Sequence, residues 1–384
     1  MSHFLTINAG SSSLKFAIYE AEEKDQPLYN GQVEAIGLTP KLIVNRNDEK
    51  TIKKVEAQTA AEALMAIFTF IKDELPDLQI SAIGHRIVHG GIEFEKPVKI
   101  NAEVIDKLEE LSPLAPLHQP HNLAAVRASI AEFPEAVQVG CFDTSFHRGH
   151  PWVNDTFALP RRFYEAGVRR YGFHGLSYEY LSAEVVRRQP ELEKGRLVIA
   201  HLGSGASLCA IRQGQSIGST MGFSALDGLP MGTRSGQIDP GVLLYLMEHE
   251  AMTASEISNL LYKESGLKGL SGISSDMRAL EQSNDVHAKE AIDYYVFRIQ
   301  REIGAMSAVL QGIDAIIFSG GVGENSSYIR SRVMEKLDYL GFQLDEEKNK
   351  AGKYDLSGAG DNKIYLLPTN EERVILEAVR DQLS

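Results

Sequence analysis

The sequence predicts an α/β protein made of two duplicated domains. The chain has 384 residues, which is longer than one hydrophobic core usually serves. Apolar strands bounded by glycine alternate with helical stretches along its length, a pattern typical of α/β architecture. A strand, a Gly/Ser turn and a second strand near the N-terminus return about half a chain later. We therefore expect two cores with a cleft between them.

The first copy of this pattern is NAGSSSLK at residues 8–15, which lies between apolar runs at 4–7 and 16–19. Gly, Ser and Asn supply turn geometry readily, so a plain hairpin turn is one interpretation. The other is a phosphate cradle, in which backbone N–H groups and hydroxyls surround an anion and Lys15 adds positive charge.

The second copy is RLVIAHLGSGASLCAI at residues 196–211. Aligning Gly10 with Gly203 (203 − 10 = 193) also brings Ala17 and Ile18 onto Ala210 and Ile211. Repeated hairpins can reflect repeated folding units alone. Because both turns consist of small residues at the same point of each unit, we favour a shared phosphate ligand.

One long helix is expected between the two hairpins, and a second long helix and a short strand are expected after the second hairpin. Residues 57–75 are rich in good helix formers, and Pro76 ends that helix. Residues 286–311 carry apolar side chains at steps of three and four, which indicates a long helix. It leads into a strand at 313–318 and the glycine-rich segment SGGVGEN.

Several clusters place charge beside glycine. Taken singly, each arginine reads as a solvated surface charge and each histidine as a hydrogen-bonded core residue. Taken with two phosphate-type turns, two loop arginines and several histidines favour an anion-transfer site. The clusters are GHRIVHGG after the apolar segment 80–83 (with His85, Arg86 and His89), FDTSFH at 142–147, RRYGFHG at 169–175 and GLPMGTRSGQIDPG at 228–241 (with Arg234).

Composition excludes several classes of protein. The chain has 39 Lys and Arg against 52 Asp and Glu, a formal charge of −13 without an acidic tail, which argues against nucleic-acid and membrane partners. Cys141 and Cys209 are too few for a disulfide framework or a thiolate metal site and are expected in the core. No signal-peptide pattern and no membrane-spanning apolar run is present, so we expect a soluble cytoplasmic protein.

Other enzyme templates do not fit. The sequence has no G-x-x-x-x-G-K-[ST] and no histidine or cysteine spacing typical of zinc sites. HLGSGASL lacks the third glycine of the dinucleotide fingerprint, and GASLC has the wrong spacing for a nucleophile elbow.

The motifs resemble those of the acetokinase (acetate kinase) family, within the actin, sugar-kinase and heat-shock-chaperone ATPase superfamily. The resemblance covers nearly the whole chain, and so many motifs in one order make a chance match very improbable. The motifs are NAGSSSLK, GHRIVHGG, APLHQPHN, FDTSFH, RRYGFHG, HLGSGAS, GLPMGTRSGQIDP, GISSDMR, SGGVGEN and PTNEE.

The resemblance implies a fold of two duplicated domains of the actin-like ATPase (ribonuclease H-like) type, with the nucleotide in the cleft between them. We expect an N-terminal domain of residues 1–145 plus 372–384, with the first phosphate turn and the carboxylate site, and a nucleotide-binding domain of residues 146–371. The family transfers a phosphoryl group reversibly between ATP and a short-chain carboxylate, with Mg²⁺ or Mn²⁺, as homodimers. The expected partners are acetate, acetyl phosphate, ATP and ADP.

The resemblance also assigns roles to residues. The catalytic group is Arg86, Asp143, His174 and Arg234. The substrate-binding group is Arg86, Val88, Leu117, His118, Phe173 and Ala225. The nucleotide-binding group is Ser11, Ser13, Lys15, His201, Leu202, Gly203, Ser204, Gly205, Asp276, Met277, Arg278, Gly321, Val322, Gly323, Glu324 and Asn325. The metal-site residues are Asn8 and Glu371.

Physical chemistry refines these roles. A carboxylate nucleophile is already ionised at pH 7, so Asp143 is read as an orienting or metal-water group and not as a base. Glu371 has an alternative role as the acidic residue in the first turn of a helix. The family usually has Asn at Ser204 and Pro at Ala225; the first change puts one phosphate contact in doubt and the second can loosen the acyl pocket.

Two alternative functions remain open. A propionate or butyrate kinase differs only in the acyl pocket, where one methylene-sized contact changes preference by about 1–3 kcal/mol. A nucleotide-gated binding protein on the same fold would need a peptide-binding appendage, and the chain stops at Ser384, directly after its last expected helix.

Overall fold

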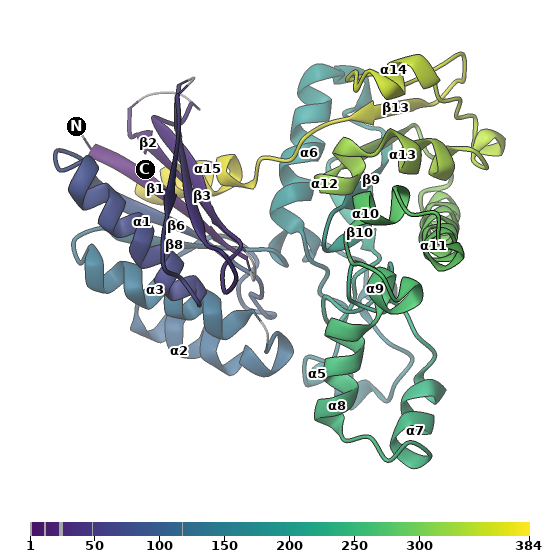
Figure 1. Cartoon of the computed structure of the whole chain (residues 1–384), viewed down its shortest axis with the longest axis horizontal. Helices are drawn as coiled ribbons and strands as arrows, with labels where there is room; N and C mark the ends of the chain where they lie inside the picture. Colours follow the sequence, from purple (N-terminus) through teal and green to yellow (C-terminus); the bar gives the residue numbers. More distant parts are fainter. Residues whose placement is uncertain (1, 11–12, 23–25, 48, 117) are drawn as a thin grey trace. The chain divides into compact units, whose positions relative to one another are not determined.

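The structure, a computed structural model, describes residues 2–10, 13–22, 26–47, 49–116 and 118–384. The chain divides into two compact units, residues 1–148 with 370–384 (unit 1) and residues 149–369 (unit 2). Each unit contains its own β-sheet with helices packed on it (Figure 1). Ser11, Ser12 and Leu117, which belong to the predicted phosphate turn and acyl pocket, lie outside the described residues.

The sheet of unit 1 has eight strands among the described residues, in the order β5-β4-β3-β2-β1-β6-β8-β7. Strand β1 is antiparallel to β2 and parallel to β6, and β6 is parallel to β8. The strands are β1 (Ser2–Ala9), β2 (Ser13–Glu20), β3 (Tyr29–Glu34), β4 (Lys41–Arg46), β5 (Glu49–Lys54), β6 (Gln79–Ile87), β7 (Val98–Lys99) and β8 (Val137–Phe142).

Helices cover both faces of this sheet. They are α1 (Ala60–Glu74), α2 (Ala102–Glu110), α3 (Gln119–Glu132) and α15 (Glu371–Leu383), with short 3₁₀ helices η1 (Ser112–Leu114) and η2 (Ser145–His147). Ile83 of β6 joins the core formed with α1 and α3. The next residue, Gly84, faces α15, because side chains alternate along a strand. A Cβ on Gly84 would lie 2.3 Å from Ile375 Cγ2, so glycine allows α15 to pack closely.

The sheet of unit 2 has the order β11-β10-β9-β12-β13 in the described part of the chain. Its strands are β9 (Arg196–Leu202), β10 (Ala206–Arg212), β11 (Gln215–Ser219), β12 (Ala315–Ser319) and β13 (Lys363–Leu366). Helices α6 and α11 both contact it. The helices are α4 (Trp152–Asp155), α5 (Arg161–Glu165), α6 (Gly175–Arg188), η3 (Pro190–Leu192), α7 (Pro240–Glu248), α8 (Ala254–Asn259), η4 (Leu260–Glu264, a π-helix), α9 (Gly266–Ser271), α10 (Met277–Glu281), α11 (Val286–Leu310), α12 (Gly320–Asn325), α13 (Ser327–Met334), η5 (Asp338–Leu340) and α14 (Glu346–Lys350).

The duplicated α/β architecture is confirmed. In unit 1 a hairpin, β1-β2, is followed by the parallel neighbour β6, and in unit 2 the hairpin β9-β10 is followed by the parallel neighbour β12. The two turns differ in length, however. Ala9 pairs with Leu14, whereas Leu202 pairs with Ala206, so the second turn is one residue shorter. The offset of 193 residues therefore holds for the first strand of each hairpin but not for the second.

The predicted long helices are confirmed with small shifts at their ends. Helix α1 begins after Thr59, whose side chain accepts a hydrogen bond from Glu62 N, and α11 begins after Asp285, which accepts from His287 N. Both are N-cap bonds that satisfy donors at a helix start. No helix of the described residues is both long enough and apolar enough to cross a membrane.

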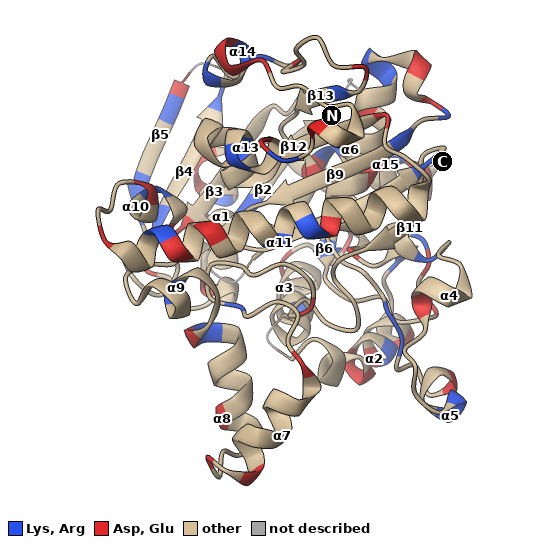
Figure 2. Ribbon diagram, turned by 90° about the vertical axis from the view of Figure 1, so that its right-hand side faces the viewer, with Lys and Arg blue, Asp and Glu red and all other residues tan. Residues whose placement is uncertain are grey.

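One expectation about Arg86 is wrong. It was expected on a loop, but it lies inside β6, which continues to Ile87. The strand extends through GHRI because β1 pairs with it on one side and β8 on the other. Charged residues of both signs are interspersed along the ribbon (Figure 2). Cys141 and Cys209 are buried with free thiols.

Candidate active site

In unit 1, Arg86 and Asp143 form a two-bonded ion pair. Arg86 Nε donates to Asp143 Oδ1 at 2.9 Å and Nη2 donates to Oδ2 at 2.5 Å. Asp143 directly follows β8 and is buried, while Arg86 is half-buried. Burial raises the pKa of Asp143, and the guanidinium of Arg86 opposes that rise. The pair fixes the plane of the guanidinium at the end of two parallel strands.

Arg86 still has donors to offer. A guanidinium carries five N–H groups, and three of them serve Asp143 and Asn8, whose Oδ1 accepts from Nη1 at 3.3 Å. Within the described residues one N–H is left on each terminal nitrogen. The outer edge of the fork, between these two nitrogens, is an edge that fits a carboxylate with two parallel bonds. The side chain can hold Asp143 on one edge and a substrate carboxylate on the other.

Acidic groups gather around Asn8, at the end of β1. Asn8 Nδ2 donates to Glu371 Oε2 at 2.7 Å and to Glu372 Oε1 at 3.4 Å. Burial raises the pKa of Glu372; Lys15 opposes this and Glu371 adds to it. Three carboxylates, counting Asp143, therefore share this corner with one arginine and one lysine.

The oxygen atoms of this corner are of the type that binds a divalent cation. They are carboxylate and amide oxygens, which are the ligands of Mg²⁺. The described residues contain no group of three or more His, Cys, Asp or Glu side chains arranged to hold a metal ion. Mg²⁺ is commonly held by one or two carboxylates together with substrate phosphates and water, so a site of this kind needs no such group.

Three more predicted residues lie at the same ends of the unit 1 strands. Lys15 on β2 pairs with Asn8 across the hairpin. Val88 is buried just after β6, and its N–H donates to Asn122 Oδ1 at 3.0 Å. His118 is the N-cap residue of α3. The structure thus brings these residues, Asn8, Arg86, Asp143 and Glu371 to the same end of one sheet.

In unit 2, two nitrogen atoms converge on the turn between β9 and β10. The turn closes with a bond from Gly203 N to Gly205 O at 3.0 Å. A Cβ built on Gly205 would lie 3.1 Å from Arg234 Nη2 and 3.2 Å from His174 Nε2. Arg234 is anchored by its Nη1, which donates to Ala225 O at 2.7 Å. A cationic group and an imidazole nitrogen therefore flank one point above a glycine.

The histidines of this turn stack on each other. The ring centroids of His174 and His201 lie 4.3 Å apart with an interplanar angle of 24°. Ser177 Oγ and His201 Nδ1 are 2.8 Å apart, and Ser207 Oγ and His174 Nδ1 are 2.7 Å apart. His174 precedes α6 with φ 59°, a left-handed conformation that a residue with a Cβ adopts rarely. Phe173, next to it, is buried.

The remaining predicted nucleotide segments belong to unit 2. Helix α12 follows β12 and begins close to the turn, since a Cβ on Gly203 would lie 3.7 Å from Gly321 N. Glu324 Oε1 accepts from Gly320 N at 2.9 Å, so that side chain stabilises its own segment. Asp276 caps α10 by accepting from Arg278 N and also pairs with the Arg278 guanidinium.

A comparison with known families identifies the chain. The model of the acetokinase family matches residues 3–377. This chain belongs to the acetokinase family. The resemblance seen in the motifs is confirmed, and the membership makes the chain a phosphotransferase of the kinase class.

Acetokinase relatives match the chain from end to end. It is 49% identical to an acetate kinase of Methylocella silvestris, covering 99% of this chain and 98% of the relative, and 47% identical to one of Nitrobacter hamburgensis, covering 98% and 95%. Among solved structures, Porphyromonas gingivalis acetate kinase matches with TM-score 0.88, 37% identity and full coverage of both chains. A propionate kinase from Francisella tularensis matches with TM-score 0.92 and 35% identity, covering 99% of this chain and all of that one. These neighbours confirm the predicted fold class.

Sequence reasoning missed several side chains that contact the predicted site residues or their neighbours. Asn122 accepts from Val88 N and donates to Ala9 O at 3.3 Å, so it ties the ends of β6 and β1 together. Glu372 contacts Asn8 and Ser207 contacts His174, while Tyr178 contacts Ser207. Asn122 and Glu372 stand inside the quoted motifs APLHQPHN and PTNEE, where their polarity was a usable signal. Ser207 likewise stands inside HLGSGAS. Tyr178 carried no signal, because its contact with Ser207 joins a helix to a strand.

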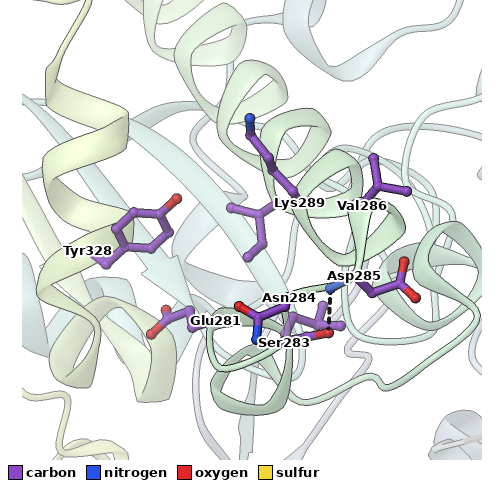
Figure 3. A pocket seen from close by; sticks show the side chains of 9 residues that line it. Glu281, Ser283, Asn284, Asp285, Val286, Lys289 and Tyr328 are labelled. Atoms are coloured by element: carbon purple, nitrogen blue, oxygen red, sulfur yellow. Dashed lines mark hydrogen bonds between the residues drawn. The ribbon is translucent and has the colours of Figure 1, made fainter.

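A cavity outside the predicted site lies elsewhere in unit 2 (Figure 3). It has a volume of about 620 Å³, and Glu281, Asp285, Lys289 and Tyr328 are among the side chains that line it. These four residues are exposed, so no desolvated charge faces the cavity. The buried and converging charges lie instead at the strand ends described above.

Enlarging Gly205 is expected to impair the site. In Gly205→Ala the new methyl group would lie against His174 and Arg234 and displace both by a few tenths of an ångström. Both side chains are predicted to act in catalysis, and a displaced catalytic group loses much of its effect, so we expect kcat to fall about tenfold or more. Steady-state kinetics measure this. Gly304→Ala, whose Cβ would make an ordinary 3.5 Å contact with Tyr339 Oη, is the control, and equal kcat values for the two variants would contradict the expectation.

His85 and His89 are core histidines, as their structural interpretation predicts. His85 Nε2 contacts Gln138 Oε1 at 2.7 Å, and His89 Nδ1 accepts from Gly91 N at 2.9 Å. Burial lowers the pKa of His85 to about 4 although Gln138 opposes the shift, and burial together with Arg148 lowers the pKa of His89 to about 3. Both are therefore neutral at pH 7.

This burial predicts acid lability. A histidine in the unfolded chain has a pKa of about 6.5. Below that pH the unfolded state binds a proton that the buried histidine does not, so the free energy of unfolding falls as the pH is lowered toward the folded pKa. For His85 alone the loss between pH 7.5 and pH 5 is about 2 kcal/mol. Urea unfolding at the two pH values measures it. His85→Gln should show a smaller loss than wild type, the exposed control His287→Gln should not, and identical pH dependence in all three would contradict the prediction.

Proposed function

We propose that this protein is an acetate kinase, which transfers the γ-phosphoryl group of ATP reversibly to acetate and yields acetyl phosphate and ADP. The observation that carries the proposal is the convergence of Arg234 Nη2 and His174 Nε2 on the small-residue turn at Gly205. A phosphoryl group in transfer spreads negative charge over its equatorial oxygens, and fixed donors around those oxygens are what it needs. The names of the relatives support the same activity.

The mechanism is a direct in-line displacement. One carboxylate oxygen of acetate forms a bond to the γ-phosphorus while the bond from that phosphorus to the β–γ bridging oxygen breaks, and ADP leaves. Acetate is ionised at pH 7 and needs no base. Arg86 holds the acid through its outer edge while Asp143 orients the guanidinium from the other edge. Arg234 and His174 stabilise the transferring group.

Asn8 and Glu371 would hold the divalent cation, Mg²⁺ or Mn²⁺, which when bound neutralises charge on the β- and γ-phosphates. Ser13 and Lys15, at the start of β2, would add donors to the phosphates. The segments 201–205, 276–278 and 321–325 would hold the rest of the nucleotide. Val88, Leu117, His118, Phe173 and Ala225 would surround the acid.

Trapping with hydroxylamine tests this activity. Acyl phosphates react with hydroxylamine to give hydroxamates, so ATP, Mg²⁺ and acetate should yield acetyl hydroxamate in proportion to enzyme. No product with acetate, propionate or butyrate would refute the proposal.

Propionate is the second candidate substrate. The Francisella propionate kinase has the higher TM-score of the two neighbours named above, and Ala225 stands where the family usually has proline. A difference of one methylene changes preference by about 1–3 kcal/mol. A panel of kcat/KM values over acetate, propionate and butyrate distinguishes the two, and we expect acetate to give the highest value.

We also propose that units 1 and 2 correspond to the two expected domains, with boundaries two or three residues from the expected ones. Glu371, expected in the second domain, then belongs to unit 1 with the carboxylate residues, and the second phosphate turn belongs to unit 2. A cytoplasmic location follows from the use of ATP. Both cysteines are free thiols, which suits a reducing compartment.

A homodimer is proposed through helix α7. None of its residues is buried, although it carries Val242, Leu244, Tyr245 and Met247, each at least 40% exposed, and Glu248 is its only charged residue (Figure 2). An apolar patch of this kind marks an interface. We expect Leu244→Asp to shift the protein from dimer to monomer in sedimentation velocity. Leu38→Asp, at an 82% exposed site in unit 1, should leave the dimer intact; a monomeric wild type or a dimeric Leu244→Asp would contradict the proposal.

A further inference from the structure

We propose that Ser207 and Tyr178 are positioning residues that fix the tautomer of His174, so that Nε2 carries the proton and serves as a hydrogen-bond donor above Gly205. The part played by His174 in phosphoryl transfer rests on the proposed function. The tautomer itself rests on the contacts of three side chains and can be tested without turnover.

Ser207 lies between the two other groups. Its Oγ is 2.7 Å from His174 Nδ1 and 2.5 Å from Tyr178 Oη. Ser207 and Tyr178 are both fully buried. Within the described residues these are the two side-chain partners of the Ser207 hydroxyl. A hydroxyl has one proton and two acceptor positions. Because the structure shows no other acceptor for the Ser207 proton within the described residues, and buried hydroxyl donors are paired, it donates to one of the two and accepts from the other.

The order of donors follows from acidity. Burial raises the pKa of Tyr178 well above its ordinary value, so the phenol keeps its proton. A phenol is a better donor than an aliphatic alcohol, and an imidazole nitrogen is a better acceptor than a phenol oxygen. The stronger pairing therefore runs from Tyr178 O–H to Ser207 Oγ and from Ser207 O–H to His174 Nδ1. A neutral imidazole that accepts at Nδ1 carries its proton at Nε2.

The ring is also held in orientation. His174 has φ 59° at the start of α6, a conformation that costs about 1–2 kcal/mol for a residue with a Cβ. Its ring stacks on His201, whose Nδ1 contacts Ser177 Oγ. Ser177 and Tyr178 are neighbours on the same helix, so the first turn of α6 holds both rings. Strain of this kind is retained where the surroundings fix a functional geometry.

The chosen tautomer has a chemical consequence. His174 Nε2 and Arg234 Nη2 lie 3.2 Å and 3.1 Å from the same point above Gly205. With the proton on Nε2, both nitrogens are donors, and an oxygen of a phosphoryl group that lay between them over the turn would accept from both. With the proton on Nδ1, the Nε2 lone pair would face that oxygen and repel it. Tyr178 and Ser207 thus act on the reaction through His174.

Long-range ¹H–¹⁵N NMR of protein labelled at histidine tests the tautomer directly. The two ring nitrogens give different ¹⁵N shifts according to which carries the proton. The His174 signals are assigned by their loss in His174→Asn. We expect the proton on Nε2 in wild type and a measurable Nδ1–H population in Tyr178→Phe and Ser207→Ala. A wild-type proton on Nδ1 would overturn the proposal even if the enzyme makes acetyl phosphate.

Kinetics supply the second measurement. We expect kcat to fall about threefold to tenfold in Tyr178→Phe and about tenfold or more in Ser207→Ala, the scale of one or two lost hydrogen bonds, with KM for ATP and acetate within about twofold. Ser207→Thr keeps the hydroxyl and should recover most of kcat.

Tyr295→Phe is the matched control, because Tyr295 Oη is buried without a hydrogen-bond partner in the described residues. Unchanged kcat and tautomer in Tyr178→Phe and Ser207→Ala would contradict the role; an inactive wild type that has its proton on Nε2 would refute the proposed function alone.

Discussion

Arg234→Ala is expected to lower kcat at least about a hundredfold, the scale of removing a major charge stabiliser at a transition state. The Arg234 guanidinium is fixed by its bond to Ala225 O and lies beside His174 Nε2 at the turn. Because charge on the transferring phosphoryl group grows toward the transition state, kcat should fall more than KM rises.

Two controls separate this effect from a general loss of structure. Arg234→Lys keeps the charge but lacks a fork that reaches both Ala225 O and a phosphoryl oxygen, so its kcat should lie between those of wild type and Arg234→Ala. Arg127→Ala removes an exposed arginine of unit 1 that pairs with Glu109 and should leave kcat unchanged. Near-normal turnover of Arg234→Ala with ATP and acetate would refute the role.

Arg86→Ala is expected to lower kcat/KM for acetate about a hundredfold or more, because two charge-assisted bonds to the acid are lost at about 1.5–3 kcal/mol each. KM for ATP should change much less. Arg86→Lys should recover little of this loss, since an ammonium group cannot bond Asp143 on one edge and a carboxylate on the other.

Arg86→Ala is also expected to be less stable than wild type. Asp143 would remain buried without its partner, near Glu371 and Glu372, and breaking a buried pair in this way costs about 3–5 kcal/mol. The double variant Arg86→Ala/Asp143→Asn removes the uncompensated charge and should regain much of the lost stability in urea unfolding, but not the lost kcat/KM. A wild-type KM for acetate in Arg86→Ala would contradict the assignment of Arg86 to the acid.

Local sequence patterns predicted the helices and hairpins that are specified by residues close together in the sequence. The helix expected at 286–311 appears as α11, Val286–Leu310, because its apolar spacing and the Asp285 cap act within a few residues. The two hairpins were predicted from small-residue turns between apolar runs. The one-residue difference between their turns was not, because Ser11 to Ser13 and Ser204 read alike as small and polar.

Contacts between distant segments could not be predicted from local patterns. Arg86 was expected on a loop, since GHRIVHGG is rich in glycine and charge, but pairing with β1 and β8 extends the strand through it. The bond between Asn8 and Glu371 joins residues 363 positions apart. The order of motifs in the family resemblance, and not spacing, indicated these residues, and their roles remain predictions.

A crystal structure with ADP or a non-hydrolysable ATP analogue and Mg²⁺ tests the central claim most directly. The account predicts terminal phosphates against the backbone of the 203–205 turn, with their oxygens within hydrogen-bond distance of His174 Nε2 and Arg234 Nη2. Phosphates bound elsewhere, with that turn and both side chains out of contact, would contradict it.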